Sequence, residues 1–106
     1  RVVLASKWAD YLVSAVRYED EIFKSKISNL KVHLDNEDTV GSGSDWTRSE
    51  VVLKSDNGYS FCTIYKSYNG WKKGSGIHIF KVDGVKYLRT DANKIKKDNL
   101  GELPEF

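Results

Sequence analysis

The stretch of sequence that decides the fold is residues 59–90, YSFCTIYKSYNGWKKGSGIHIFKVDGVKYLRT. Asn69-Gly70 and Asp83-Gly84 interrupt it, and both dipeptides are typical of two-residue type I′ hairpin turns. We therefore expect a meander of three antiparallel strands, over residues 59–68, 71–82 and 85–90. The run Gly74-Ser75-Gly76 within the second strand predicts a β-bulge, because a glycine inside a strand often marks such an irregularity.

The turn at Asp83-Gly84 also predicts which side chains share a face of the last hairpin. Side chains alternate along a strand and opposite residues lie on the same face, so the register follows from the turn. One face carries the pairs Val82–Val85, Phe80–Tyr87 and His78–Arg89, and the other carries Lys81–Lys86, Ile79–Leu88 and Ile77–Thr90. Both faces are partly apolar, so we expect both to be covered.

The sequence before this meander contains one strong helix signal. Thr47 and Glu50 have the spacing of a capping box, in which each residue satisfies a backbone N–H of the other. Trp46 and Val51 occupy the two positions of a hydrophobic staple around the same cap. We expect a helix over residues 48–56, and the Asn-Gly dipeptide that follows favours its end there.

Two further strands are expected before the helix, over residues 11–18 and 27–34. The second of them, ISNLKVHL, alternates apolar and polar positions, which is typical of a half-buried strand. We interpret residues 41–44, GSGS, as a flexible loop inside the domain. The expected element order is therefore ββαβββ. The expected class is α+β: a small single domain with a mostly antiparallel sheet and one short helix.

A chain of 106 residues has room for one hydrophobic core, so a single domain is expected over residues 1–106. Residues 1–10 are expected to form an N-terminal arm. Residues 91–106 are expected to form a C-terminal tail that packs on the sheet through Leu100, Leu103 and Phe106. The short helix can cover only part of one sheet face. The arm, the tail, a second subunit or a ligand must therefore cover the remainder.

The net charge of +2 conceals an uneven distribution. Residues 66–97 contain nine basic and two acidic residues, a net charge of +7, whereas residues 1–65 carry −2 and residues 98–106 carry −3. A basic segment of this kind can present one face to an anionic partner. The same lysines can equally pair with carboxylates from the rest of the chain, so both interpretations stay open.

The single cysteine, Cys62, excludes an internal disulfide. Small extracellular domains usually carry several disulfides, so a reducing compartment is favoured and we expect a cytoplasmic protein. No stretch approaches the run of about 20 apolar residues that a membrane span needs, and no membrane partner is expected.

Several short motifs resemble one protein family. They lie at residues 15–18 (AVRY), 31–33 (KVH), 46–48 (WTR), 87–93 (YLRTDAN) and 98–106 (DNLGELPEF), and around Trp71. Together they are similar to the small, mostly bacterial proteins catalogued as domain of unknown function 3892, over nearly the whole chain from about Tyr11. The resemblance implies a compact stand-alone domain. It implies no activity and no catalytic or binding residue, and residues 1–10 lie outside it.

No arrangement of residues predicts catalysis, a metal site or a cofactor. Cys62 could be activated by His33 or His78 only with that base in reach, and its apolar strand predicts an inert thiol. The same three residues lack the spacing of metal ligands. The Asp and Asn residues of 91–99 are attributed to turn chemistry and not to calcium binding. We therefore expect a non-enzymatic protein without a cofactor.

The most informative constellation is basic and aromatic. Aromatic residues and lysines cluster around Asn69-Gly70 and on the adjacent hairpin, and such a sheet can stack bases while its cations hold phosphates. The candidate binding surface consists of Tyr68, Trp71, Lys72, Lys73, Lys86 and Arg89. The structural alternative is that these aromatic residues belong to the core and that the lysines protect an edge strand from aggregation.

Two functions stay open. The leading hypothesis is a non-enzymatic interaction module that binds a protein partner or its own copy through an uncovered apolar sheet face or hairpin edge. The alternative is a nucleic-acid-binding domain that uses the basic and aromatic segment 66–97. Salt dependence separates them, because neutralising phosphates makes binding weaken steeply with added salt.

Overall fold

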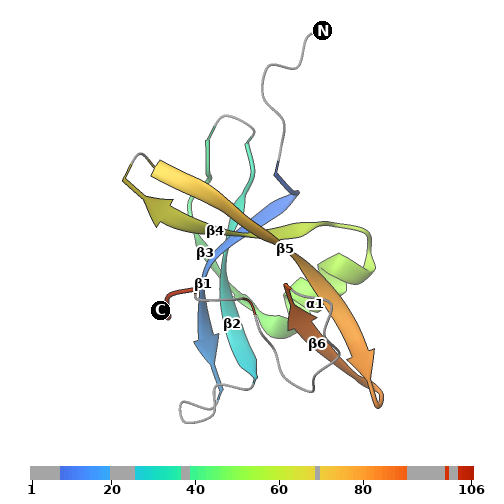
Figure 1. Cartoon of the computed structure of the whole chain (residues 1–106). Helices are drawn as coiled ribbons and strands as arrows, with labels where there is room; N and C mark the ends of the chain where they lie inside the picture. The colour runs from blue at the N-terminus through green and yellow to red at the C-terminus, as the bar shows by residue number, and fades with distance from the viewer. Residues whose placement is uncertain (1–7, 20–25, 37–38, 69, 91–99, 101–102) are drawn as a thin grey trace, which may run out of the picture.

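The structure, a computed structural model, describes residues 8–19, 26–36, 39–68, 70–90, 100 and 103–106. The elements are β1 (Tyr11–Tyr18), β2 (Ile27–Leu34), β3 (Ser44–Thr47), α1 (Arg48–Asp56), β4 (Phe61–Ser67), β5 (Gly70–Val82) and β6 (Val85–Arg89) (Figure 1). A small domain with mostly strands and one short helix in its described part agrees with the expected class. β1, β2 and α1 have the predicted bounds. β3 was not predicted: its residues overlap the GSGS loop and the helix cap, and both suppress a strand signal.

The strands form one mixed sheet in the order β3-β2-β1-β4-β5-β6. β1 and β4 run parallel and pair through Tyr11 with Phe61, Leu12 with Cys62 and Val13 with Thr63. The other neighbouring pairs are antiparallel. The expected sheet is therefore corrected in two respects, the additional edge strand β3 and the parallel pair at the centre. Parallel pairing joins residues about fifty positions apart, and nothing in a local pattern predicts it.

The β5–β6 hairpin has the predicted register, from His78 opposite Arg89 to Val82 opposite Val85. The two turn residues have positive φ angles, 50° at Asp83 and 82° at Gly84, as a type I′ turn requires. The register prediction is thus confirmed. The other predicted turn, Asn69-Gly70, includes Asn69, which lies outside the described residues.

The predicted bulge in β5 is present. Cys62 pairs with Gly76 and Ile64 with Lys73, so β5 has one residue more than β4 between these pairs. The hydroxyl of Thr63 lies in the irregularity: it accepts from the Ser75 N–H at 2.9 Å and donates to the Ser75 carbonyl at 3.3 Å. The Thr63 hydroxyl therefore supplies hydrogen-bond partners to the backbone groups of Ser75 where the β-ladder is interrupted.

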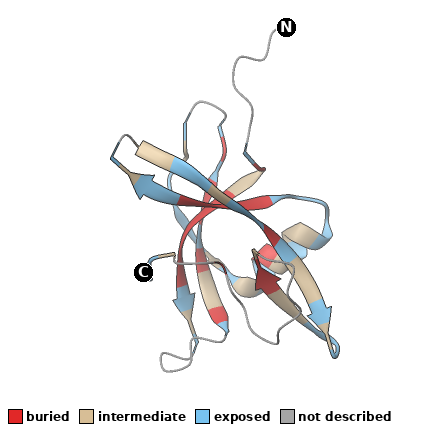
Figure 2. Cartoon of the chain, viewed as in Figure 1, coloured by how far each residue is buried: buried red, intermediate tan, exposed pale blue. Residues whose placement is uncertain are grey.

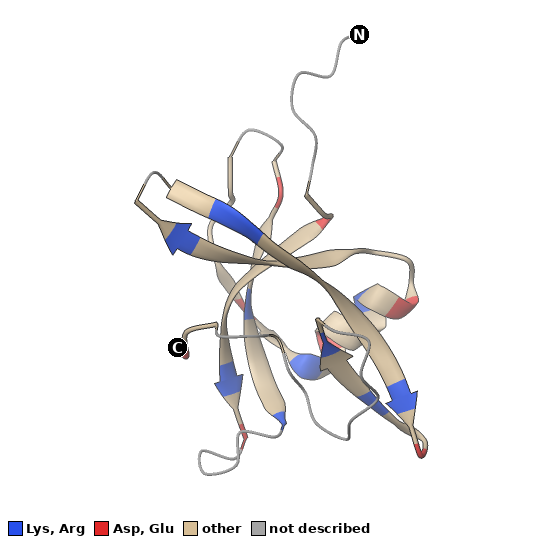
Figure 3. Ribbon diagram, in the orientation of Figure 1, with Lys and Arg blue, Asp and Glu red and all other residues tan. Residues whose placement is uncertain are grey.

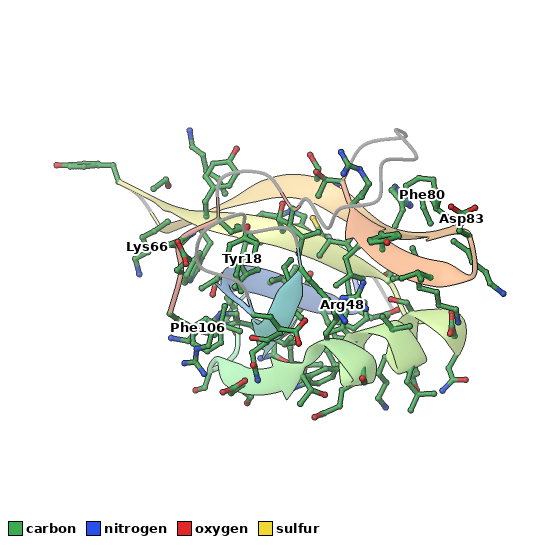
Figure 4. The ribbon with its side chains drawn as sticks, turned by 90° about the horizontal axis from the view of Figure 1, so that it is seen from below. Tyr18, Arg48, Lys66, Phe80, Asp83 and Phe106 are labelled. Carbon is green, nitrogen blue, oxygen red and sulfur yellow. The ribbon has the colours of Figure 1, made fainter. Side chains whose placement is uncertain are left out.

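The larger core lies on the face of the sheet that α1 covers, and α1 forms a second layer there (Figure 4). The capping box at Thr47 and Glu50 is present as predicted, and Val51 is the helix residue that is fully buried. The buried members of this cluster are Val13, Val16, Ile27, Leu30, Val32, Val51, Phe61, Ile77, Leu88 and Leu100. Figure 2 shows this burial concentrated where the strands cross at the middle of the molecule.

The opposite face carries a smaller cluster of Ala9, Leu12, Cys62 and Ile64, against which Val40 and Trp71 pack. Residues from the N-terminal side and from the loop after β2 thus contribute to its cover. On the α1 side, Leu103 packs against the larger core, and the Val16 N–H donates to the Pro104 carbonyl at 2.9 Å.

We expect Gly74→Ala to destabilise the fold, with Gly76→Ala as the matched control. A Cβ atom at Gly74 would lie 2.1 Å from the Thr63 hydroxyl oxygen and 2.8 Å from its carbonyl oxygen, whereas one at Gly76 would meet nothing closer than the His78 ring at 3.7 Å. Overpacking of this kind costs about 1–3 kcal/mol. Urea unfolding measures both variants, and equal midpoints would contradict the role given to the bulge.

Candidate functional site

The free end of the β4–β5 hairpin carries most of the predicted surface. We call residues 65–68 and 70–73 the hairpin tip; it projects from the body of the molecule (Figure 1). Tyr65 pairs with Lys72 across the two strands, and Lys66 pairs with Trp71. Successive pairs lie on opposite faces, so Tyr65 and Lys72 share one face of the hairpin tip, and Lys66 and Trp71 share the other. Lys73, which pairs with Ile64, lies on the same face as Trp71.

The aromatic residues of the hairpin tip differ in exposure. Tyr68 is fully exposed, at 102% of its reference area, and Tyr65 is 47% exposed. Trp71 is half-buried, because its ring packs on the smaller core cluster and lies 5.6 Å from the His33 ring. The ammonium group of Lys66 lies 4.9 Å from the centre of the Trp71 ring. Trp71 therefore anchors the hairpin tip, whereas the two tyrosines are accessible to a partner.

The charge of the hairpin tip is of one sign. Residues 61–82 contain four lysines and neither Asp nor Glu. Figure 3 shows lysine without acidic residues along this end of β4 and β5. Lys72 and Lys73 are exposed, and within the described residues Lys66, Lys72 and Lys73 have no ion pair. These cations are available to an anionic ligand.

Two of the six predicted surface residues lie elsewhere. The Lys86 ammonium group pairs with the Asp56 carboxylate at 2.5 Å, and its backbone carbonyl accepts from the Arg48 guanidinium. Lys86 lies opposite Lys81, nine residues along β5 from Lys72, which corresponds to about 30 Å of strand. Arg89 is only 2% exposed and is removed from the candidate surface. The hairpin register placed Arg89 on a face, but burial depends on what packs against that face.

A cavity of about 490 Å³ adjoins the base of the hairpin tip. Tyr65 and Lys73 line it from the hairpin, and Leu100 and Leu103 line it from the C-terminal segment. Its remaining wall includes Ser75 and Thr90. No feature of the sequence indicated this cavity, because it forms between segments that are far apart in the chain.

A groove of about 530 Å³ lies between α1 and the β5–β6 hairpin. Its apolar lining includes Val52, Leu53 and Val85; of these, Leu53 is 61% and Val85 46% exposed. The cations along it are Arg48, Lys81 and Lys86. Two of these cations are engaged within the protein by the contacts to Asp56 and to the Lys86 carbonyl.

A buried serine–histidine pair was not predicted. Ser14, the additional residue in a bulge of β1, has its hydroxyl 2.6 Å from Nε2 of His33. The other ring nitrogen, Nδ1, lies 2.7 Å from the Gly41 carbonyl, which can only accept, so Nδ1 donates and Nε2 accepts from Ser14. Both side chains are about 5% exposed. The pair has the bonding of a nucleophile and its base, but both side chains are buried, and the bond links β1 with β2 inside the fold.

Cys62 is buried, and burial raises the pKa of its thiol above the ordinary value, against smaller opposing effects of the Lys73 charge and the Gly74 backbone. Its sulfur contacts the carbonyl of Thr63. Both His33 nitrogens are occupied elsewhere, and His78 is exposed next to Phe80. Neither histidine is thus placed to activate the thiol.

Among the residues that the structure describes, no three His, Cys, Asp or Glu side chains gather as metal ligands would. The Asp and Asn residues of 91–99 lie outside that part of the chain. Within the same part, no helix is both long and apolar enough to cross a bilayer.

Comparison with known proteins gives one match. The family model described as "Protein of unknown function (DUF3892)" matches residues 13–104. No curated protein and no solved structure matches the chain.

We expect Cys62 to be protected from alkylation in the native protein. A thiol that is buried and has a raised pKa contains little thiolate, which is the reactive form, at neutral pH. Iodoacetamide should label the native protein slower than the urea-unfolded protein by about two orders of magnitude or more. Mass spectrometry over time measures both rates. Labelling at comparable rates would show that the thiol is accessible and would reopen the question of its reactivity.

Proposed function

This chain belongs to the family described as Protein of unknown function (DUF3892), and since that description carries no activity, we propose from the hairpin tip that it is a non-enzymatic module that binds single-stranded nucleic acid. The observation that carries the proposal is the meeting of exposed tyrosines with unpaired lysines at one projecting end of the sheet. The aromatic rings stack on bases, and the lysines neutralise phosphates.

The placement of the aromatic residues at the hairpin tip favours a single strand over a duplex. Its accessible aromatic residues, Tyr65 and Tyr68, lie on one face and at the end of a two-stranded ribbon, where they can reach bases only if those bases are unstacked. Stacking of a base on an aromatic ring contributes about 1–3 kcal/mol and tolerates any base. A ribbon that combines accessible tyrosines with lysines thus supports binding with little sequence preference.

The electrostatics favour the hairpin tip over the rest of the basic segment. Near α1, the Lys86 charge is already compensated by Asp56, and the Arg48 guanidinium donates to a backbone carbonyl. At the hairpin tip, in contrast, the strands contribute cations only. An anionic ligand gains most where the protein does not already compensate the charge.

The test is the salt dependence of binding to a labelled deoxythymidine oligomer of about ten nucleotides, measured by fluorescence anisotropy. For single strands the logarithm of the binding constant falls with the logarithm of salt concentration by about 0.7 per neutralised phosphate. We expect Lys72→Ala with Lys73→Ala to reduce that slope by about 0.7 for each lysine removed. Tyr68→Ala should weaken binding about tenfold and preserve the slope.

Lys81→Ala is the matched control, because Lys81 is an exposed lysine on the same strand outside the hairpin tip. It should leave both affinity and slope close to those of the unchanged protein. Absence of oligonucleotide binding by the unchanged protein, or equal effects of Lys81 and the tip lysines, would refute the proposal.

A protein partner is the second candidate, and the groove between α1 and the β5–β6 hairpin favours it. Leu53 and Val85 are the exposed apolar residues of this groove, and Lys81 adds an exposed cation that has no ion pair in the described residues. The complementary ligand is a peptide with apolar side chains and carboxylates. This site replaces the uncovered sheet face of the earlier hypothesis, since residues of the N-terminal side, the C-terminal segment and α1 pack against the sheet.

The corresponding prediction uses a labelled peptide of alternating leucine and glutamate residues. Leu53→Ser should abolish its binding, whereas Leu34→Ser should not, although Leu34 is similarly exposed at 52% on β2. Neither change should alter stability by more than about 0.5 kcal/mol, because both are surface substitutions. Equal binding by the two variants in anisotropy titrations would exclude the groove as the peptide site.

A further inference from the structure

The cavity at the base of the hairpin tip has the size and lining of a ligand site. Its volume of about 490 Å³ lies in the range of pockets that hold small molecules. Leu100 and Leu103 provide an apolar wall. No hydrogen bond within the described residues engages the hydroxyl groups of Tyr65, Ser75 or Thr90, which line the same cavity. An apolar wall facing free hydroxyl groups suits a planar ligand with a polar edge.

The cavity is continuous with the hairpin tip. Tyr65 lines the cavity and pairs with Lys72, so the two side chains share one face of the hairpin. Lys73 also lines the cavity, and no carboxylate lines it among the described residues. A nucleic-acid backbone that lies along this face, held by Lys72, therefore passes the opening of the cavity.

We infer that this cavity receives one base of the bound single strand. The inference rests on the proposed function and assigns it a site. The Tyr65 ring stacks on the base, Leu103 packs on the other side, and the hydroxyl groups of Ser75 and Thr90 bond to the polar edge. Two hydrogen bonds hold the backbone of Ser75 in this wall, because the Thr63 hydroxyl accepts from its N–H and donates to its carbonyl.

The test compares two oligomers of about ten nucleotides that carry the same phosphates, one of deoxythymidine and one with abasic sites throughout. Ser75→Phe fills the cavity and leaves every lysine in place. We expect this variant to bind the deoxythymidine oligomer about tenfold more weakly and the abasic oligomer with unchanged affinity. The matched control is Ser44→Phe, at an exposed serine on the edge strand β3, which should change neither affinity.

A second measurement, which does not use a variant, keeps the test decisive if Ser75→Phe fails to fold. In the unchanged protein, titration with deoxythymidine monophosphate should shift the amide resonances of Gly74, Ser75 and Thr90 and leave those of β3 in place. Oligomer binding by Ser75→Phe that equals binding by the unchanged protein would overturn the base site and leave the nucleic-acid function standing. If the unchanged protein binds neither oligomer, the proposed function fails. The monophosphate shifts then decide separately whether the cavity is a nucleotide site, and their absence overturns it.

Discussion

The short parallel pairing of β1 with β4 is the interaction on which the other features depend. It joins the two halves of the sheet through three residues of each strand, Tyr11–Val13 and Phe61–Thr63. Beyond Thr63, β4 leaves β1 and continues with β5 alone. The place that β4 vacates beside β1 is taken by the C-terminal segment, where Val16 and Glu105 form a parallel bridge. One strand thus diverges from the sheet at the point where another segment replaces it.

This divergence explains both parts of the candidate site. Among the described residues, the end of β4 and the start of β5 have no further neighbours in the sheet, so they project as a two-stranded ribbon. Trp71 packs one face of this ribbon on the smaller core cluster, and the Tyr65 face borders the cavity. The bulge opposite Thr63 increases the local twist of that ribbon where it leaves the body. The cavity lies where β4 and the C-terminal segment separate, between Thr63 and Tyr65 on one side and Leu100 and Leu103 on the other. The hairpin tip and the cavity are therefore two consequences of one break in the pairing.

The sequence predicted those features that depend on neighbouring residues. The capping box defined α1, and Asp83-Gly84 defined the register of the last hairpin, because backbone sterics and local hydrogen bonds determine both. The parallel pairing, the cavity and the bond between Ser14 and His33 were not predictable in this way, since each joins strands whose relative placement has no local signal. For the candidate surface, strand spacing predicted the neighbours at the hairpin tip, but it could not predict that Arg89 is buried.

Trp71 shows why a basic and aromatic composition does not by itself identify a binding surface. Trp71 and Tyr65 belong to adjacent cross-strand pairs of the same ribbon, yet alternation turns them to opposite faces. Trp71 meets the cluster of Leu12, Cys62 and Ile64, and burial there fixes the orientation of the ribbon. Tyr65 meets the cavity and is left available for stacking. The parity of the strand position, and not the residue type, separates the aromatic residue that holds the hairpin tip from the one that can bind a ligand.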